Sequence, residues 1–186
     1  IYNTPFALSH DKIEEQFAVN YVGHFHFTIS ILPLLRKSLE PRIVNVTSSL
    51  HALASAPGGI LFKTINDPTA MTGVQRYAQS KLANILFTRA LHKRFGDTIF
   101  INSADLGYVA TNIAKRQQDG TLKILDAISG PLFAKSASDG ALTQIYAAAG
   151  SDVVEKGYRG VYFAPLASKE TGDKALSALA KRLRSF

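Results

Sequence analysis

The chain has 186 residues, 46% of them hydrophobic and 19% charged, which is typical of one folded globular domain and excludes a disordered chain. It contains no cysteine, which excludes a disulfide framework and a thiolate metal site. The net charge of +7 permits an anionic partner, but no basic cluster is interleaved with aromatic residues, so no nucleic-acid partner is expected.

The first part of the chain predicts a long helix followed by a strand. Asp11 and Glu14 have the spacing of a capping box, and the apolar periodicity after them predicts a helix from about Asp11 to Lys37. Pro33 lies inside that span and should kink or end the helix. Arg42–Ser48 is short and β-branched, so it predicts a buried strand.

A loop, a second helix and a second strand follow. Residues 52–73 are interrupted by glycines and prolines and predict a loop, which at that length is usually functional. Val74–Phe95 predicts a helix that ends at Gly96. Thr98–Ser103 predicts the second strand.

The remaining elements are a third helix and a third strand. Residues 105–134 are expected to be irregular, with a short helix near Leu122–Ile128. Ala137–Ala149 predicts a helix that Gly150 ends, and Gly160–Ala164 predicts a strand. Strands that alternate with long helices predict the α/β class, with a parallel sheet covered on both faces. Three strands are few for such a sheet, which suggests that part of the domain is missing.

The segment Tyr77-Ala78-Gln79-Ser80-Lys81 is the candidate for acid–base chemistry. A spacing of four places Tyr77 and Lys81 on one face of the predicted helix. A free phenol has a pKa of about 10, and a nearby ammonium lowers it, so the pair could exchange a proton with a substrate oxygen. A Tyr and a Lys at this spacing most often carry no function, so the assignment needs support from other residues.

Two further polar residues provide that support. Ser48 lies at the carboxyl end of a predicted strand, where ligands of parallel sheets bind, and its hydroxyl could hold a carbonyl oxygen. A serine at this point can also be a turn or cap residue. Asn20 lies within an apolar helix, where asparagine is a poor helix former and a buried amide needs partners.

Several segments occur together in a fixed order. They are EEQFAVNYVGHF (14–25), RIVNVTSSLH (42–51), YAQSKLANILFTRAL (77–91), GYVAT (107–111), GALTQIYAA (140–148) and GYRGVYFAP (157–165). In these segments the chain resembles the short-chain dehydrogenases/reductases, in particular the branch of the retinol dehydrogenases and WW-domain-containing oxidoreductases. Because the segments cover nearly the whole chain in register, the resemblance is far more specific than any one motif.

The resemblance implies an NAD(P)-dependent oxidoreductase that interconverts an alcohol and a carbonyl by hydride transfer. By position, Tyr77 matches the catalytic acid/base, and Lys81 matches the lysine that lowers the tyrosine pKa and binds the nicotinamide ribose. Ser48 matches the serine that orients the substrate oxygen, and Ser49 is the neighbour most easily confused with it. Asn20 matches the asparagine that holds a water in the proton relay.

The resemblance also implies a cofactor, with NADP slightly favoured over NAD, and no metal. The residues that match its cofactor contacts are Asn20, Tyr77, Lys81, Gly107, Val109 and Thr111. The residue that chooses between NAD and NADP falls outside this sequence.

The sequence departs from the family pattern in two respects. The glycine-rich TGxxxGxG turn that cradles the pyrophosphate and the Asn-Asn-Ala-Gly segment are both absent from it. It therefore resembles the last three strands and their helices of a Rossmann-type doubly wound parallel sheet, apparently truncated, as one domain over residues 1–186. Leu106 stands where the family usually has a proline before Gly107, which could loosen the loop that closes on the nicotinamide.

The partners implied by the resemblance are an apolar alcohol or carbonyl substrate and a second copy of the chain. The apolar residues before Tyr77 suggest a pocket, although they could equally be core; they are Phe62, Ile65, Met71 and Val74. The first long helix and the Tyr77 helix resemble those that dimerise in the family. The basic tail Lys174–Arg184 is amphipathic and is expected to be a surface helix rather than a membrane contact.

Other readings remain open. The chain could be a non-catalytic fragment without a pyrophosphate site, or an interaction module that uses its basic tail. Asn45 begins a glycosylation sequon inside a predicted buried strand, so no modification is expected there. His24 and His26 lie on different helix faces and predict no metal site. Because the chain lacks cysteine, which is compatible with the cytosol, a cytoplasmic location is expected.

Overall fold

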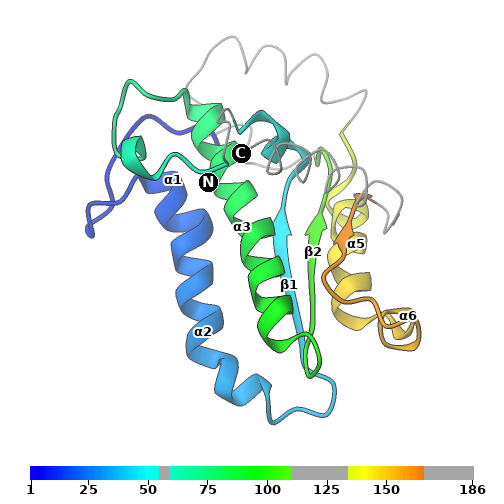
Figure 1. Cartoon of the computed structure of the whole chain (residues 1–186). Helices are drawn as coiled ribbons and strands as arrows, with labels where there is room; N and C mark the ends of the chain where they lie inside the picture. The colour runs from blue at the N-terminus through cyan, green and yellow to red at the C-terminus, as the bar shows by residue number, and fades with distance from the viewer. Residues whose placement is uncertain (55–58, 110–133, 166–186) are drawn as a thin grey trace.

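Three parallel strands form the centre of the chain (Figure 1). The computed structural model describes residues 1–54, 59–109 and 134–165. The strands are β1 (Arg42–Thr47), β2 (Phe100–Asp105) and β3 (Tyr162–Phe163), in the spatial order β1-β2-β3. β1 and β2 pair in register from Arg42 opposite Phe100 to Thr47 opposite Asp105. In the described part of the chain β1 pairs with β2 alone, so one sheet edge is bare there.

Helices cover both faces of this sheet (Figure 1). One face carries α2 (Gly23–Leu35) and α3 (Gly73–Phe95), and the other carries α5 (Ala137–Ala149) and α6 (Ser151–Glu155). This arrangement confirms the predicted Rossmann-type α/β class with a doubly wound parallel sheet.

Alternation along the strands separates the two apolar layers. Ile43 and Ile101 face α2 and α3, whereas their neighbours Val44 and Phe100 pack on the opposite face. The first layer consists of Leu32, Ile43, Phe87, Leu91, Ile99 and Ile101. The second consists of Phe100, Ala147, Val153 and Phe163, with Val44, Tyr146, Val154, Tyr158 and Val161 at its border.

The first helix begins later than the capping-box spacing predicts. Lys12 has a φ of 61°, in the left-handed region, so the backbone cannot be helical from Asp11. The N-cap is Glu14, whose carboxylate accepts a hydrogen bond from the Phe17 N–H at 2.8 Å. The helix therefore starts as α1 (Glu15–Phe17) and passes through a π-helical segment, Ala18–Val22, before α2.

The end of α2 follows Pro33 closely. The helix runs through the proline and ends two residues later, at Leu35. A proline this close to the end removes a hydrogen bond from the last full turn only, so the prediction of a helix end near this residue holds.

The second strand starts and ends two residues later than predicted. After Gly96 the chain makes a tight turn, in which the N–H groups of Thr98 and Ile99 both donate to the Phe95 carbonyl, so these residues still belong to the helix end. β2 consequently extends to Asp105, which the sequence places in a loop. This shift brings a carboxylate to the carboxyl end of the sheet.

Smaller differences affect the connections. The predicted loop 52–73 overlaps a 3-10 helix, Ser49–Leu53, and contains a second one, Phe62–Thr64. Gly150 ends α5 as predicted, but α6 follows it directly and has no counterpart in the sequence pattern. The strand predicted over residues 160–164 is reduced to β3. The helix predicted near residues 122–128 and the basic tail 174–184 lie outside the described residues.

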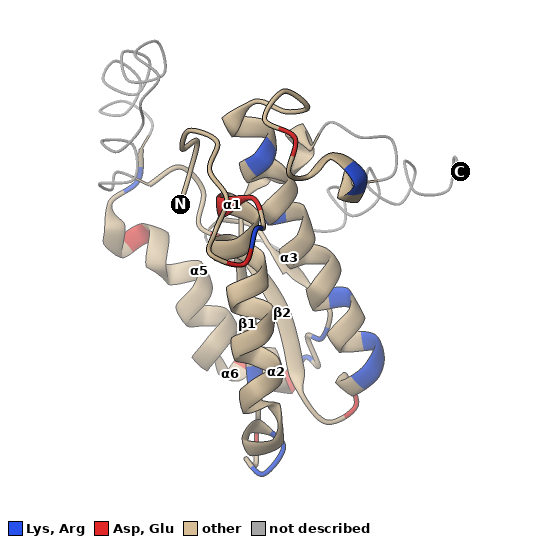
Figure 2. Cartoon of the chain, turned by 90° about the vertical axis from the view of Figure 1, so that its left-hand side faces the viewer, with Lys and Arg blue, Asp and Glu red and all other residues tan. Residues whose placement is uncertain are grey.

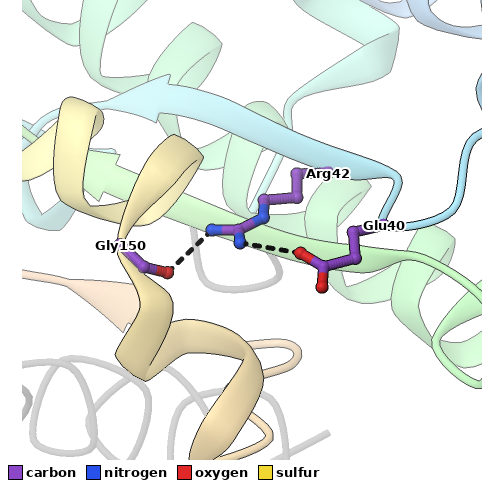
Figure 3. A network of polar contacts seen from close by, with 3 residues as sticks. All are labelled: Glu40, Arg42 and Gly150. Carbon is purple, nitrogen blue, oxygen red and sulfur yellow. Dashed lines mark hydrogen bonds and ion pairs between the residues drawn. The ribbon is translucent and has the colours of Figure 1, made fainter.

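Arg42 connects the start of β1 to the helices on the far face (Figure 3). Its guanidinium donates to the Gly150 carbonyl at 2.8 Å and to the Glu40 carboxylate at 3.3 Å. This side chain thereby links the turn between α5 and α6 to the amino-terminal end of β1.

The positive charges do not gather on one element. Figure 2 shows the Lys and Arg segments at separate places along the described chain, including the end of α3. Within the ranges that the structure describes, no helix is long and apolar enough to cross a membrane.

The layered core predicts how two apolar residues differ in their effect on stability. Ile101, in β2, is fully buried against α3, so Ile101→Ala should lower the free energy of unfolding by about 2–5 kcal/mol. Leu142, on α5, is 50% exposed, and Leu142→Ala should change the free energy of unfolding by less than about 0.5 kcal/mol. Urea unfolding of the intact protein measures both; an equal loss in the two variants would contradict this core.

Candidate active site

Ser48, Tyr77 and Lys81 meet beyond the carboxyl end of β1. Ser48 directly follows that strand in extended conformation, and its side chain forms a hydrogen bond with the Tyr77 side chain. Tyr77 lies in the second turn of α3, and the Lys81 ammonium one turn later lies 5.6 Å from the centroid of its ring. α3 begins with a Thr72–Gln75 capping box that fixes the register of both side chains. The structure thus brings together three of the predicted catalytic residues.

Burial dominates the protonation of Tyr77. It raises the pKa of the phenol to about 12, and the Asp105 charge and Tyr2 act in the same direction. The hydrogen bond from Ser48 opposes them and lowers the pKa. This direction is the reverse of the expected one, because desolvation of the phenolate outweighs any attraction to the ammonium. At neutral pH the Tyr77 hydroxyl therefore keeps its proton.

The Lys81 side chain is also buried, with 8% of its surface exposed. Burial lowers its pKa to about 8, while the negative charge of Asp105 acts to raise it. Among the described residues, its Nζ donates one hydrogen bond, to the Val46 carbonyl at 3.3 Å. Because an ammonium has three N–H groups, the geometry leaves donors that a ligand hydroxyl can use.

Asn20 is linked to this cluster through neighbouring polar groups. It lies in the π-helical segment Ala18–Val22, a rare helix form that is frequent at functional sites. Its Nδ2 donates to the Ser80 hydroxyl at 3.0 Å and to the Ile1 carbonyl at 2.8 Å. These bonds satisfy the buried amide that the sequence pattern marks as needing partners.

Asn84 joins the π-helical segment to the sheet, a role that the sequence analysis misses. Its Nδ2 donates to the backbone carbonyl of Asn20 at 3.1 Å and to that of Val46 at 3.2 Å, and Lys81 shares the second acceptor. Its Oδ1 is buried and has no hydrogen-bond partner among the described residues. A polar residue within the apolar stretch that follows Lys81 is the sequence signal for it.

Asp105 is a second residue that the sequence analysis misses as part of the site. It is buried, and its Oδ2 accepts hydrogen bonds from the Ser49 N–H at 2.8 Å and the Tyr162 hydroxyl at 3.0 Å. Its Oδ1 accepts one from the Gly107 N–H at 2.8 Å. An acidic residue directly after an apolar strand is the signal that would have found it.

The residues expected near the nicotinamide follow Asp105. Gly107 has a φ of +74°, and a Cβ there would lie 2.9 Å from Pro165 Cγ, so glycine is required twice over. The bond from its N–H to Asp105 closes an Asx-turn, which fixes the backbone where Leu106 replaces the usual proline. Val109 forms a parallel bridge with Lys135, and Thr111 lies outside the described residues.

Other predicted features are placed as follows. Met71 is buried and Phe62 is 69% exposed, and the apolar pocket expected from these residues stays a prediction. Asn45 is buried and donates to the Thr88 hydroxyl at 2.8 Å, so its sequon is inaccessible in the folded chain. His51 is buried beside the site, with its Nδ1 2.7 Å from the Ser48 carbonyl.

Comparison with known proteins adds several relatives, although no family model matches the chain. The short-chain dehydrogenase TIC 32 B, chloroplastic, of Brassica napus is 40% identical over 86% of this chain and 51% of its own length. Retinol dehydrogenase 14 of Homo sapiens is 36% identical over 98% of this chain and 54% of its own length. The WW domain-containing oxidoreductase of Pongo abelii is 31% identical over 96% of this chain and 45% of its own length.

Solved structures share the fold. A crystal structure of an uncharacterized protein from Mycobacterium paratuberculosis matches with a TM-score of 0.60 and 26% identity, over 100% of this chain and 64% of the other. A crystal structure of a short chain dehydrogenase from Escherichia coli CFT073, complexed with NADPH, matches with a TM-score of 0.55 and 19% identity. The match covers 81% of this chain and 51% of the other. At that identity the second match shows the fold alone.

The parallel sheet, its flanking helices and the polar cluster at its carboxyl end define a Rossmann-like α/β chain. With the relatives above, the chain belongs to the short-chain dehydrogenase/reductase family. It spans about half the length of the curated relatives it matches.

The buried position of Lys81 predicts an abnormal titration. After reductive ¹³C-methylation, its NMR signal should titrate near pH 8, because burial disfavours the ammonium. Lys156 is the matched control, since its ion pair with Asp152 on the surface raises its pKa above the ordinary value. The Lys81→Arg variant assigns the signal. Lys81 titrating together with Lys156 would contradict the burial described here.

Proposed function

We propose that this chain carries the proton-transfer site of an NAD(P)-dependent oxidoreductase that interconverts an alcohol and a carbonyl. The observation that carries the proposal is the cluster of Ser48, Tyr77 and Lys81 beyond the carboxyl end of β1. Family membership supports the reaction class, and the partly buried phenol, whose pKa desolvation raises, supports a proton exchange partly shielded from water.

Each side chain has a separate role in this proposal. Tyr77 donates its hydroxyl proton to the carbonyl oxygen in reduction and accepts it back from the alcohol in oxidation. The Ser48 hydroxyl donates a hydrogen bond that holds the same substrate oxygen. Burial raises the pKa of Tyr77 to about 12, so at neutral pH the phenol carries the proton that carbonyl reduction requires.

The residues present fit a nicotinamide cofactor. The buried Lys81 ammonium has donors left for a sugar diol. By resemblance, Gly107 matches a cofactor-binding position, and Val109 and Thr111 match the residues near the carboxamide. The cofactor, when bound, supplies or receives the hydride, while the protein supplies orientation and the proton. A slight preference for NADP over NAD stays a prediction. A cytoplasmic location also stays a prediction.

Replacement of Tyr77 tests the assignment. Tyr77→Phe in the intact protein should lower kcat for carbonyl reduction by at least about 10²-fold, because the ring remains but the proton donor is lost. Binding of NADPH or NADH should persist. Tyr146→Phe, on α5 outside the site, is the matched control and should keep kcat within about twofold. Turnover by Tyr77→Phe at the wild-type rate would remove Tyr77 from the reaction.

The rival reading is a non-catalytic chain, which the absence of the glycine-rich turn from this sequence supports. It is tested by calorimetric titration of residues 1–186 with NADPH and NADH. Saturable binding to this chain would overturn the non-catalytic reading. Lack of binding here, together with turnover by a protein that carries the family's glycine-rich turn ahead of this chain, would assign the pyrophosphate site to that turn.

We also propose a homodimer formed through the outer face of α2. This helix is apolar nearly all round, yet only Thr28 and Leu32 are buried, and a helix of that kind is normally covered. Its exposed apolar side chains here, with Val19 before it, are Val19, Phe25, Phe27, Ile29 and Leu34. A second copy of the chain offers the same surface and can cover it symmetrically.

A charge on that face should separate the copies. Phe27 is 65% exposed, and Phe27→Lys should convert a dimer to a monomer in sedimentation velocity, because a lysine is costly to bury. Leu142→Lys places the same charge on the exposed side of α5 and should leave the dimer intact. A wild-type monomer, or a dimer that Phe27→Lys leaves unchanged, would contradict this interface.

A further inference from the structure

Asp105 holds together the three segments that end beside the candidate site. Its carboxylate accepts the N–H of Ser49 after β1, the N–H of Gly107 after β2 and the hydroxyl of Tyr162 in β3. All three donor–acceptor distances lie between 2.8 and 3.0 Å. Ser49 is the neighbour of Ser48, and Gly107 begins the loop expected to close on the nicotinamide.

The carboxylate is dedicated to these three donors. It is only 2% exposed, and the part of the chain that the structure describes contains no ion pair to it. A buried carboxylate is costly unless hydrogen bonds satisfy it, and bonds from backbone N–H groups to a charged acceptor are among the strong ones. With both oxygens occupied, Asp105 does not present a free oxygen to a substrate.

Its charge also reaches the proton-transfer pair. The negative charge of Asp105 acts to raise the pKa values of both Lys81 and Tyr77. The other groups that interact electrostatically with this pair are the Ile1 amino group, His24, Ser48 and Tyr2. Asp105 is the only carboxylate in this set, so Asp105→Asn removes one negative charge from beside the pair.

We propose that Asp105 is a positioning residue of the active site, whose buried carboxylate ties the Ser48–Ser49 turn to the backbone at Gly107. The catalytic consequence of this role rests on the proposed function. The hydrogen bonds of Asp105 can be tested without any activity measurement. It also explains why a poor strand former occupies the last position of β2.

Asp105→Asn tests the proposal in the intact protein. An amide has one acceptor oxygen and cannot accept from both backbone N–H groups and the phenol as the carboxylate does. Hydrogen exchange at the Ser49 or Gly107 amide, followed by NMR, should become at least tenfold faster. The kcat for carbonyl reduction should fall at least tenfold, and the apparent pKa of the Tyr77–Lys81 pair in the pH–rate profile should move down by at least about 0.5 unit.

Two further variants separate position from charge. Asp152→Asn removes a carboxylate from the surface pair with Lys156 and should change neither the exchange rates nor the profile. Asp105→Glu keeps the charge but displaces the oxygens, so it should speed the exchange and leave the apparent pKa near the wild-type value. If Asp105→Asn does not fold, the exchange rates in Asp105→Glu decide the proposal.

The outcomes distinguish this inference from the proposed function. Wild-type exchange rates and an unshifted profile in Asp105→Asn, with turnover abolished by Tyr77→Phe, would overturn the role of Asp105 and leave the function standing. If the wild-type protein shows no turnover, the proposed function fails. In that case faster exchange at Ser49 or Gly107 would still support the tie, and unchanged exchange would overturn it.

Discussion

The in-register parallel pairing of β1 with β2 is the constraint on which the site depends. Because Thr47 lies opposite Asp105, both strands end at the same level, and the residues after each strand become neighbours. A shift of one residue would turn Ile101 away from α3 and carry Asp105 away from the Ser49 N–H. The core and the site therefore require the same register, since the apolar layers on both faces stabilise the strand alignment that the polar groups use.

Most polar groups near the site pair with one another, although the buried Asn84 Oδ1 has no partner among the described residues. Asn84 is fully buried in α3, and it connects Asn20 in the π-helical segment with Val46 in β1. Loss of the two Nδ2 hydrogen bonds would leave a further buried polar group unpaired, so these links restrict how the helices can sit on the sheet. The π-helical segment is consistent with this restriction, because the extra residue in its turn shifts the backbone relative to a regular α-helix.

The sequence predicts the elements well and their junctions less well. Apolar periodicity locates α3 to within one residue, because that helix has a capping box at its start and a glycine at its end. Periodicity does not reveal that Lys12 is left-handed or that Thr98 still belongs to a helix end, since both depend on local hydrogen bonds. Ser48, Tyr77 and Lys81 can be selected from sequence motifs. The roles of Asp105 and Asn84 depend on contacts between segments distant in sequence, which a motif does not reveal.

Burial determines the protonation of both Tyr77, whose charged form is an anion, and Lys81, whose charged form is a cation. Burial disfavours charge, so it raises the pKa of Tyr77 and lowers that of Lys81. Between about pH 8 and 12 both groups are therefore neutral, and below about pH 8 both carry their protons. In either range the phenol holds the proton that a carbonyl oxygen needs during reduction. Oxidation of an alcohol requires the phenolate instead, so that direction needs a lower pKa of Tyr77, which a positive charge closer to the phenol than the Lys81 ammonium would produce.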